Sequence, residues 1–182
     1  MKEINKFRTI YELKKVYREN SVEKRKESSA EHSWSCLILA DYFMSKHDMK
    51  LDRLKVYELL MYHDLLEIET EDVPLNPENN RIEKNEEKEI KILENKLPYP
   101  INLKFIDLYK EYKERKTKEA RFSKAIDVLD AQIHELDYKE DWKGWTREFL
   151  VEQKIKYVKE FSPLEEAFNE VVEYLIENDF LE

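Results

Sequence analysis

The sequence contains very little glycine: Gly144 is the only one among its 182 residues. Glycine adopts left-handed backbone conformations at low cost, so its scarcity disfavours β folds that are rich in hairpins. Glycine-rich phosphate loops and dinucleotide-binding fingerprints each need several glycines, which excludes them here. We therefore expect an all-α protein.

Cysteine, basic charge and long apolar runs are also scarce. The single cysteine, Cys36, excludes an internal disulfide and fits a reducing cytoplasm. The formal net charge is −9, and the sequence has no obvious basic face of the kind that binds nucleic-acid polymers. No run of 18 apolar residues predicts a membrane span, and the opening MKEINKFRTI lacks the apolar core of a signal peptide. We expect a cytoplasmic protein that binds neither a nucleic-acid polymer nor a membrane.

Hydrophobic residues make up 41% of the chain, which is enough for a core, and the length suits one domain spanning residues 1–182. Apolar residues recur with helical spacing, which predicts about seven to eight helices. The expected helices are residues 3–17, 28–46, 52–67, 81–96, 102–114, 117–138, 145–160 and 163–178, with Ser162 capping the last. Residues 18–27 and 69–80 are expected to be loops. The helix at 28–46 is apolar almost all round, so we expect it to be central, with Trp34 in the core.

The four histidines are the first candidates for chemistry. His32 begins the expected helix at 28–46, and the pair His63 and Asp64 ends the next one, so two antiparallel helices would bring them together. Imidazole and carboxylate ligands suit a divalent first-row metal. The alternative is an ordinary packed, hydrogen-bonded histidine, which we expect of His134, whereas His47 is expected to be exposed.

Three blocks follow one another along the chain: RKESSAEHSW, YHDLLEIETEDVP and KEARFSKAIDVLDA. Their histidine, His-Asp pair and distant aspartate resemble the signature of the HD-domain phosphohydrolase superfamily, and most closely its 5′-deoxynucleotidase branch. The resemblance runs from about Arg18 to Tyr138. It implies an HD-domain helical bundle on which the helices at 145–178 pack.

The resemblance also implies the metal ligands, namely His32, His63, Asp64 and Asp127. They would hold one divalent ion, with Mn²⁺ or Co²⁺ as activator and Fe²⁺, Ni²⁺ or Zn²⁺ as other possible occupants. Asp127 lies on an apolar helical stripe, where a carboxylate is tolerable when it binds a metal. Asp130 shares this face, and we expect it either to support a ligand or to be exposed.

Glu67 and Asp72 follow the His-Asp pair. The resemblance implies that Glu67 orients or activates the attacking water; the alternative is an ordinary ion pair at a helix end. Asp72 would help select deoxyribose by crowding a 2′-hydroxyl. The family has glycine immediately before this aspartate, and here Glu71 stands in its place.

Three basic residues are candidates for binding phosphate. The resemblance implies Arg18, whose guanidinium suits a phosphate, and Arg25 is its rival. Lys124 either reaches the phosphate or is a surface lysine. Some family members have a tryptophan after the arginine that packs on the nucleoside, but Glu19 follows Arg18 here.

The expected activity is that of a metal-dependent phosphomonoesterase that converts deoxyribonucleoside 5′-monophosphates to deoxynucleoside and phosphate. Its partner would be a small nucleotide substrate, and a homodimer is possible because family members are often dimers. One alternative is an HD-fold phosphohydrolase that acts on another nucleotide or a small phosphoester. The other is a non-catalytic helical binding module with a vestigial metal site.

Overall fold

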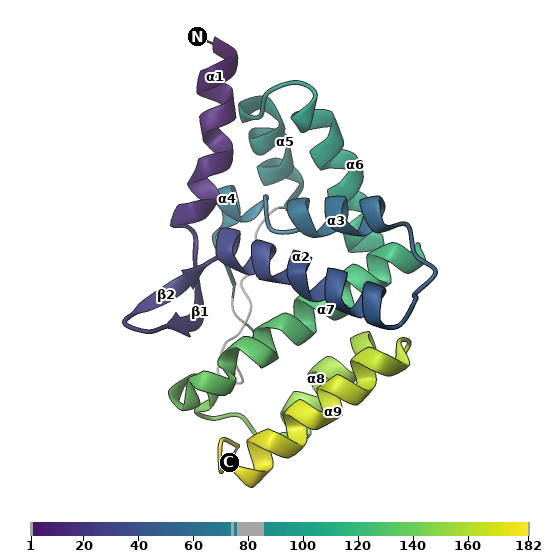
Figure 1. The fold of residues 1–182 in the computed structure, drawn as a ribbon. Coiled ribbons are helices and arrows are strands. Elements are labelled where there is room, and N and C mark those ends of the chain that lie inside the picture. Colours follow the sequence, from purple (N-terminus) through teal and green to yellow (C-terminus); the bar gives the residue numbers. More distant parts are fainter. Residues whose placement is uncertain (1, 74, 76–85, 182) are drawn as a thin grey trace.

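The computed structural model describes residues 2–73, 75 and 86–181, and this part of the chain is predominantly helical (Figure 1). The elements in order are α1 (Lys2–Phe7), the 3₁₀ helix η1 (Arg8–Lys15), β1 (Tyr17–Val22), β2 (Arg25–Ser28), α2 (Ser29–Lys46), α3 (Arg53–Tyr62), α4 (Glu67–Thr70), α5 (Glu86–Lys96), α6 (Ile101–Glu114), α7 (Lys118–His134), η2 (Glu135–Asp137), η3 (Lys139–Trp142), α8 (Arg147–Val158) and α9 (Ser162–Glu177). The all-α prediction is confirmed. No helix in these ranges has the length and apolar character needed to cross a membrane. The expected helix start at 81–85 lies outside the described residues.

Side-chain caps fix the starts of several helices. Ser28 and Glu31 form a reciprocal capping box at the start of α2: the Ser28 hydroxyl accepts from the Glu31 N–H, and the Glu31 carboxylate accepts from the Ser28 N–H at 2.9 Å. At the start of α3, the Asp52 side chain accepts a hydrogen bond from a backbone N–H of the first turn, and the Thr117 hydroxyl does the same at the start of α7. The predicted cap at Ser162 is wrong, because α9 already begins at Ser162.

The predicted loop at 18–27 is wrong, because these residues belong to an antiparallel β-hairpin. Tyr17 pairs with Ser28 and Val22 with Arg25, with an irregularity between Tyr17 and Ser21. The turn between the strands is made without glycine, since Glu23 adopts a φ of 52°. Short polar strands with a non-glycine turn give almost no periodic signal, which explains why sequence reasoning missed the hairpin.

The predicted helix at 52–67 is interrupted. α3 ends at Tyr62, a turn follows, and the single-turn helix α4 begins at Glu67. Leu65 and Leu66 in the turn are each 4% exposed, so this turn is anchored in the core. The apolar pattern that looked like a continuing helix comes from this buried turn, which carries His63 and Asp64.

The core consists of two groups of buried side chains that meet at α7. The larger group joins α2, α7, α8 and α9 around Phe122, Ile126 and Phe168, and the smaller one joins α3, α5 and α6 around Phe105. α7 packs against α2, α3, α6, α8 and α9, and in Figure 1 it runs between α2 and α3 on one side and α8 and α9 on the other. The prediction that Trp34 lies in the core is wrong, because its side chain is 66% exposed.

Candidate metal centre and active site

The four predicted ligands come from three elements and lie together. His32 begins α2, His63 and Asp64 follow α3, and Asp127 lies in the middle of α7. The imidazole rings of His32 and His63 have centroids 5.4 Å apart. His32 Nε2 lies 3.1 Å from Asp127 Oδ1, and His63 Nε2 lies 3.1 Å from Asp64 Oδ2. These contacts arise because α2 and α3 pack against each other and α7 packs against both.

Hydrogen bonds orient both imidazole rings. His63 Nδ1 donates to the carbonyl oxygen of Leu60 at 2.7 Å, which leaves Nε2 with a free lone pair. His32 Nδ1 donates to Asp130 Oδ2 at 3.0 Å, and Ser35 Oγ donates to the same oxygen at 2.6 Å. Asp130 is buried, so of its two expected roles the structure favours support of His32 over exposure.

Several polar atoms of this cluster make no hydrogen bond to the residues that the structure describes. They are His63 Nε2, Asp64 Oδ2 and Glu67 Oε2, which are buried without a partner in the described part of the chain. Buried polar atoms are usually paired, and buried carboxylates are tolerable when they bind a metal. Two imidazoles and two carboxylates form a donor set that suits a divalent first-row ion. The residues therefore fit the cation that the sequence predicts.

Cys36 lies against the cluster, one turn along α2 from His32. His32, Cys36 and His63 offer ligand atoms that all lie within 4.8 Å of one another, so this trio is a second set that could hold a metal. Cys36 Sγ lies 3.7 and 3.6 Å from the two ring nitrogens of His32, which indicates packing against the ring. In the metal-free site, burial raises the pKa of the Cys36 thiol to about 12.

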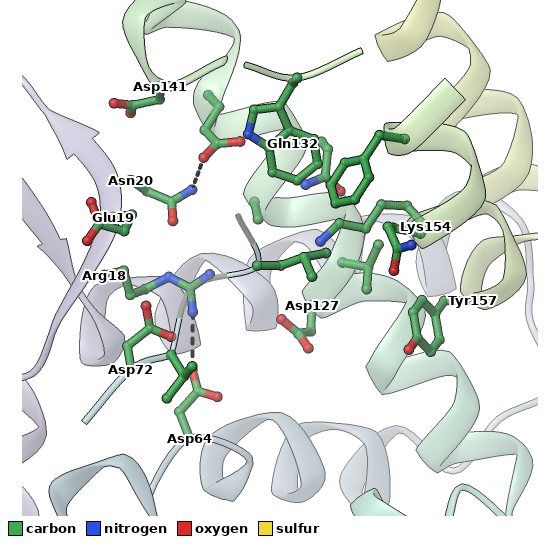
Figure 2. A pocket seen from close by; sticks show the side chains of 18 of the residues that line it. Arg18, Glu19, Asn20, Asp64, Asp72, Asp127, Gln132, Asp141, Lys154 and Tyr157 are labelled. Atoms are coloured by element: carbon green, nitrogen blue, oxygen red, sulfur yellow. Dashed lines mark hydrogen bonds and ion pairs between the residues drawn. The ribbon is translucent and has the colours of Figure 1, made fainter. Parts of the chain in front are cut away.

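Arg18 extends from β1 into the cluster (Figure 2). Its Nη1 lies 3.8 Å from Asp64 Oδ2 and its Nε lies 3.3 Å from Glu27 Oε2. Burial opposes its charge, but Asp64 and Asp72 outweigh this effect and raise the pKa of Arg18. The rival candidate, Arg25, instead pairs with Glu31 at 2.7 Å on the surface. Arg18 is therefore the arginine that reaches the cluster.

Glu67 and Asp72 add two further carboxyl groups to the cluster. Burial, followed by the charges of Asp64 and Asp72, raises the pKa of Glu67 to about 9. Burial also raises the pKa of Asp72. In the absence of a cation, Glu67 is therefore protonated at neutral pH. Carboxyl groups held this close together in a buried site are a further reason why a divalent cation fits here.

Lys124 and Tyr112 hold the second oxygen of Asp127. Lys124 Nζ and the Tyr112 hydroxyl each donate to Asp127 Oδ2 at 2.6 Å, whereas Oδ1 faces His32. Burial would raise the pKa of Asp127, but Lys124 and His32 outweigh it and hold the pKa well below its ordinary value. Lys124 also lines the cavity described below, which places its ammonium group at the cluster.

A cavity of about 930 Å³ opens over these groups, and its volume is within the range of about 300–1,000 Å³ that is usual for ligand pockets. Among its lining residues at the cluster are Arg18, Asp64, Glu67, Asp72, Lys124 and Asp127. α8 forms much of the opposite wall with Phe149, Gln153, Lys154 and Tyr157. Sequence reasoning gave these four residues no role; the only signal was that Phe149, Gln153 and Tyr157 recur every four residues along one helix.

Glu71 adopts the backbone conformation that the family's glycine would allow. Its φ is 59° and its ψ is 163°, a region that is essentially restricted to glycine. Its N–H donates to the carbonyl oxygen of Glu67 at 2.8 Å, which closes α4. The turn that leads to Asp72 therefore forms with Glu71 in place of glycine, at the cost of backbone strain.

The remaining histidines lie away from the cluster. His47 is exposed, as predicted. His134 is half-buried, and its Nε2 donates to the Ser21 carbonyl oxygen at 2.8 Å, where it joins α7 to β1. This bond agrees with the expected structural role.

Comparisons with known proteins agree with this geometry. Residues 10–170 match the HD domain family. A 5′-deoxynucleotidase, HDDC2 of Xenopus laevis, is 28% identical over 142 residues, which cover 77% of this chain and 68% of the relative. The chain belongs to the HD-domain family of metal-dependent phosphohydrolases.

Solved structures show the same fold. A predicted metal-dependent phosphohydrolase from Magnetospirillum magnetotacticum superimposes with a TM-score of 0.86 at 25% identity, over 99% of this chain and 94% of that one. An HD-domain phosphohydrolase from Listeria innocua has a TM-score of 0.62 at 18% identity, over 96% of this chain and 87% of that one. The second likeness supports the fold alone.

Proposed function

We propose that the protein is a phosphomonoesterase that hydrolyses deoxyribonucleoside 5′-monophosphates to deoxynucleoside and phosphate. The observation that carries the proposal is the meeting of two imidazoles and two carboxylates, those of His32, His63, Asp64 and Asp127, at the base of a cavity that Arg18 and Lys124 also line. Among the described residues, His63 Nε2 and Asp64 Oδ2 are buried there without a hydrogen-bond partner. The name of the Xenopus laevis relative supports the choice of substrate.

The metal would be held by His32 Nε2, His63 Nε2 and the carboxylates of Asp64 and Asp127. When bound, a divalent ion supplies Lewis-acid polarisation of a phosphate oxygen and a lowered pKa for water. Mn²⁺ or Co²⁺ suits this donor set, as do Fe²⁺, Ni²⁺ and Zn²⁺. Asp130 holds the ring of His32 in the tautomer that presents Nε2.

The side chains around the cluster have complementary tasks. Arg18 binds the phosphate and neutralises the charge that develops on its oxygens, and Lys124 adds a second cation beside it. Glu67 holds the attacking water and accepts its proton. Asp72, beyond the turn at Glu71, lies against the sugar and disfavours a 2′-hydroxyl.

Phosphate release from a panel of ribo- and deoxyribonucleoside monophosphates tests the proposal. The protein is treated with a chelator and assayed before and after addition of Mn²⁺ or Co²⁺. We expect chelation to abolish release, the metal to restore it, and Asp64→Ala to remain inactive with metal. Activity that survives chelation or Asp64→Ala would contradict the proposal. Equal rates on ribo and deoxy substrates would contradict the role of Asp72 alone.

A further inference from the structure

The cavity continues beyond the cluster along one face of α7. From α7 and the residue that follows it, the cavity is lined by Lys124, Asp127, Val128, Ala131, Gln132 and Glu135. Their spacing of mostly three and four residues places them on a single helix face. Gln132 lies about 7.5 Å along the helix axis from Asp127, at 1.5 Å per residue. The lining thus changes from charged groups at Asp127, through Val128 and Ala131, to the amide of Gln132, beyond which lies the carboxyl group of Glu135.

An aromatic wall lies beside this part of the cavity. Trp145 and Phe149 both line it, with ring centroids 5.2 Å apart and planes at 68°. Trp145 also packs edge-on against Trp142, which is fully buried, at 5.8 Å. Trp142 is itself fixed by a hydrogen bond from its indole N–H to the Glu135 carbonyl oxygen. The aromatic wall is therefore held rigidly and offers a surface for a flat ring.

The amide oxygen of Gln132 is buried and makes no hydrogen bond to any described residue. The side chain is 2% exposed, and its Oε1 is buried without a hydrogen-bond partner among the described residues. Buried amides are normally paired. Figure 2 shows Gln132 and Lys154 among the cavity side chains, and Lys154 enters from α8. A glutamine amide carries a donor and an acceptor side by side, which is the arrangement that pairs with the edge of a nucleobase.

We propose that Gln132, Trp145, Phe149 and Gln153, which we call the α7–α8 subsite, bind the nucleobase of the substrate. Gln132 pairs with the base edge, and the aromatic wall contacts its face. The inference rests on the proposed function, because it assigns the base half of the same nucleotide. The α7–α8 subsite also supplies a contact with the base, which Glu19, the residue after Arg18, does not offer. The enzyme then acts on nucleotides in preference to base-free phosphate esters.

Calorimetric titration of the metal-free protein measures this preference without turnover. The ligands are the four deoxyribonucleoside 5′-monophosphates and, as the base-free probe, deoxyribose 5-phosphate. We expect the dissociation constant of the base-free probe to be about 10-fold or more above those of the nucleotides, since base–aromatic stacking and one amide pair both contribute. Equal dissociation constants for the two kinds of ligand would overturn the subsite.

Gln132→Leu removes the amide at similar volume and is the decisive variant. We expect it to weaken nucleotide binding about 5- to 10-fold and to leave the base-free probe unchanged. Ser123→Ala is the matched control, because it also deletes a buried unpaired polar group from α7 but does not line the cavity. An equal loss for both ligands in Gln132→Leu would show that Gln132 only supports the fold, which would overturn its role.

Phosphate release from the same samples after addition of Mn²⁺ separates the two proposals. Preferential nucleotide binding without release would contradict the proposed function and support the subsite. The opposite outcome is that deoxyribose 5-phosphate binds as tightly as the nucleotides and releases phosphate with the same kcat/KM. That result would support a phosphomonoesterase activity and overturn the subsite.

Discussion

Asp130 Oδ2 accepts a hydrogen bond from His32 Nδ1 at 3.0 Å, and it does so from one turn beyond Asp127 on α7. α7 thus supplies two carboxylates: Asp127 lies at Nε2 of His32, and Asp130 accepts a hydrogen bond from Nδ1 on the other side of the ring. Ser35 donates to Asp130 in turn, so the supporting carboxylate is itself fixed.

Asp130→Ala should weaken metal binding about 10- to 100-fold, because His32 then loses the bond that fixes its tautomer and orientation. Competition against a chromogenic chelator measures the affinity. The metal affinity of Asp130→Asn should fall between those of Asp130→Ala and the wild type, since the amide oxygen still accepts the hydrogen bond. The role of Asp130 would be refuted by an unchanged affinity in a folded Asp130→Ala protein.

Cys36→Ala distinguishes the two possible ligand sets. If Asp64 and Asp127 complete the site, this variant should retain its metal after dialysis, whereas Asp127→Ala should lose it. Its Co²⁺ absorption spectrum should match that of the wild type and lack a thiolate charge-transfer band. Loss of the metal from a folded Cys36→Ala protein would instead assign the thiol as a ligand.

Glu71→Gly should stabilise the protein by about 1 kcal/mol, because glycine adopts a φ of 59° with a ψ of 163° without the strain that a side chain suffers there. Chemical denaturation of metal-free protein measures the change. Glu71→Ala is the matched control: it removes the carboxylate but keeps Cβ, so its stability should stay near that of the wild type. Equal gains in both variants would attribute the effect to lost charge.

The sequence predicted the helices because their apolar stripes are long, and it predicted the cluster because three blocks carry it. What it missed depends on contacts between distant residues. The hairpin that carries Arg18 is short and polar, and only its pairing makes it a strand. The wall formed by α8 faces α7 only once the chain has folded. Trp34 looked like a core residue, yet it lies on the exposed face of a helix whose other faces are buried.

The break after Tyr62 shows a limit of periodicity. Leu65 and Leu66 continue the apolar pattern of α3, and they are buried as that pattern predicts, but in a turn. A buried turn satisfies the same spacing as a helix over so few residues. The consequence matters for the site, because this turn carries two members of the cluster, His63 and Asp64.

Glu135, at the end of the cavity away from the cluster, should make stability depend on pH. Burial, followed by the charge of Asp141, raises its pKa from 4.5 to about 8. Between these values the folded protein binds a proton that the unfolded chain does not. Protonated Glu135 therefore makes its full contribution to the free energy of unfolding below about pH 4.5, and this contribution is lost as the pH rises through 8.

Glu135→Gln should remove this dependence. The amide still accepts the hydrogen bond that Asn20 donates at 2.8 Å, and it carries no charge at any pH. Denaturation of metal-free protein should find both proteins about equally stable at pH 5 and the variant more stable by about 1–3 kcal/mol at pH 9. Glu173→Gln, at an exposed position of α9, is the control and should match the wild type at both pH values. A stability difference for Glu135→Gln that is the same at pH 5 and pH 9 would show that Glu135 does not titrate between them.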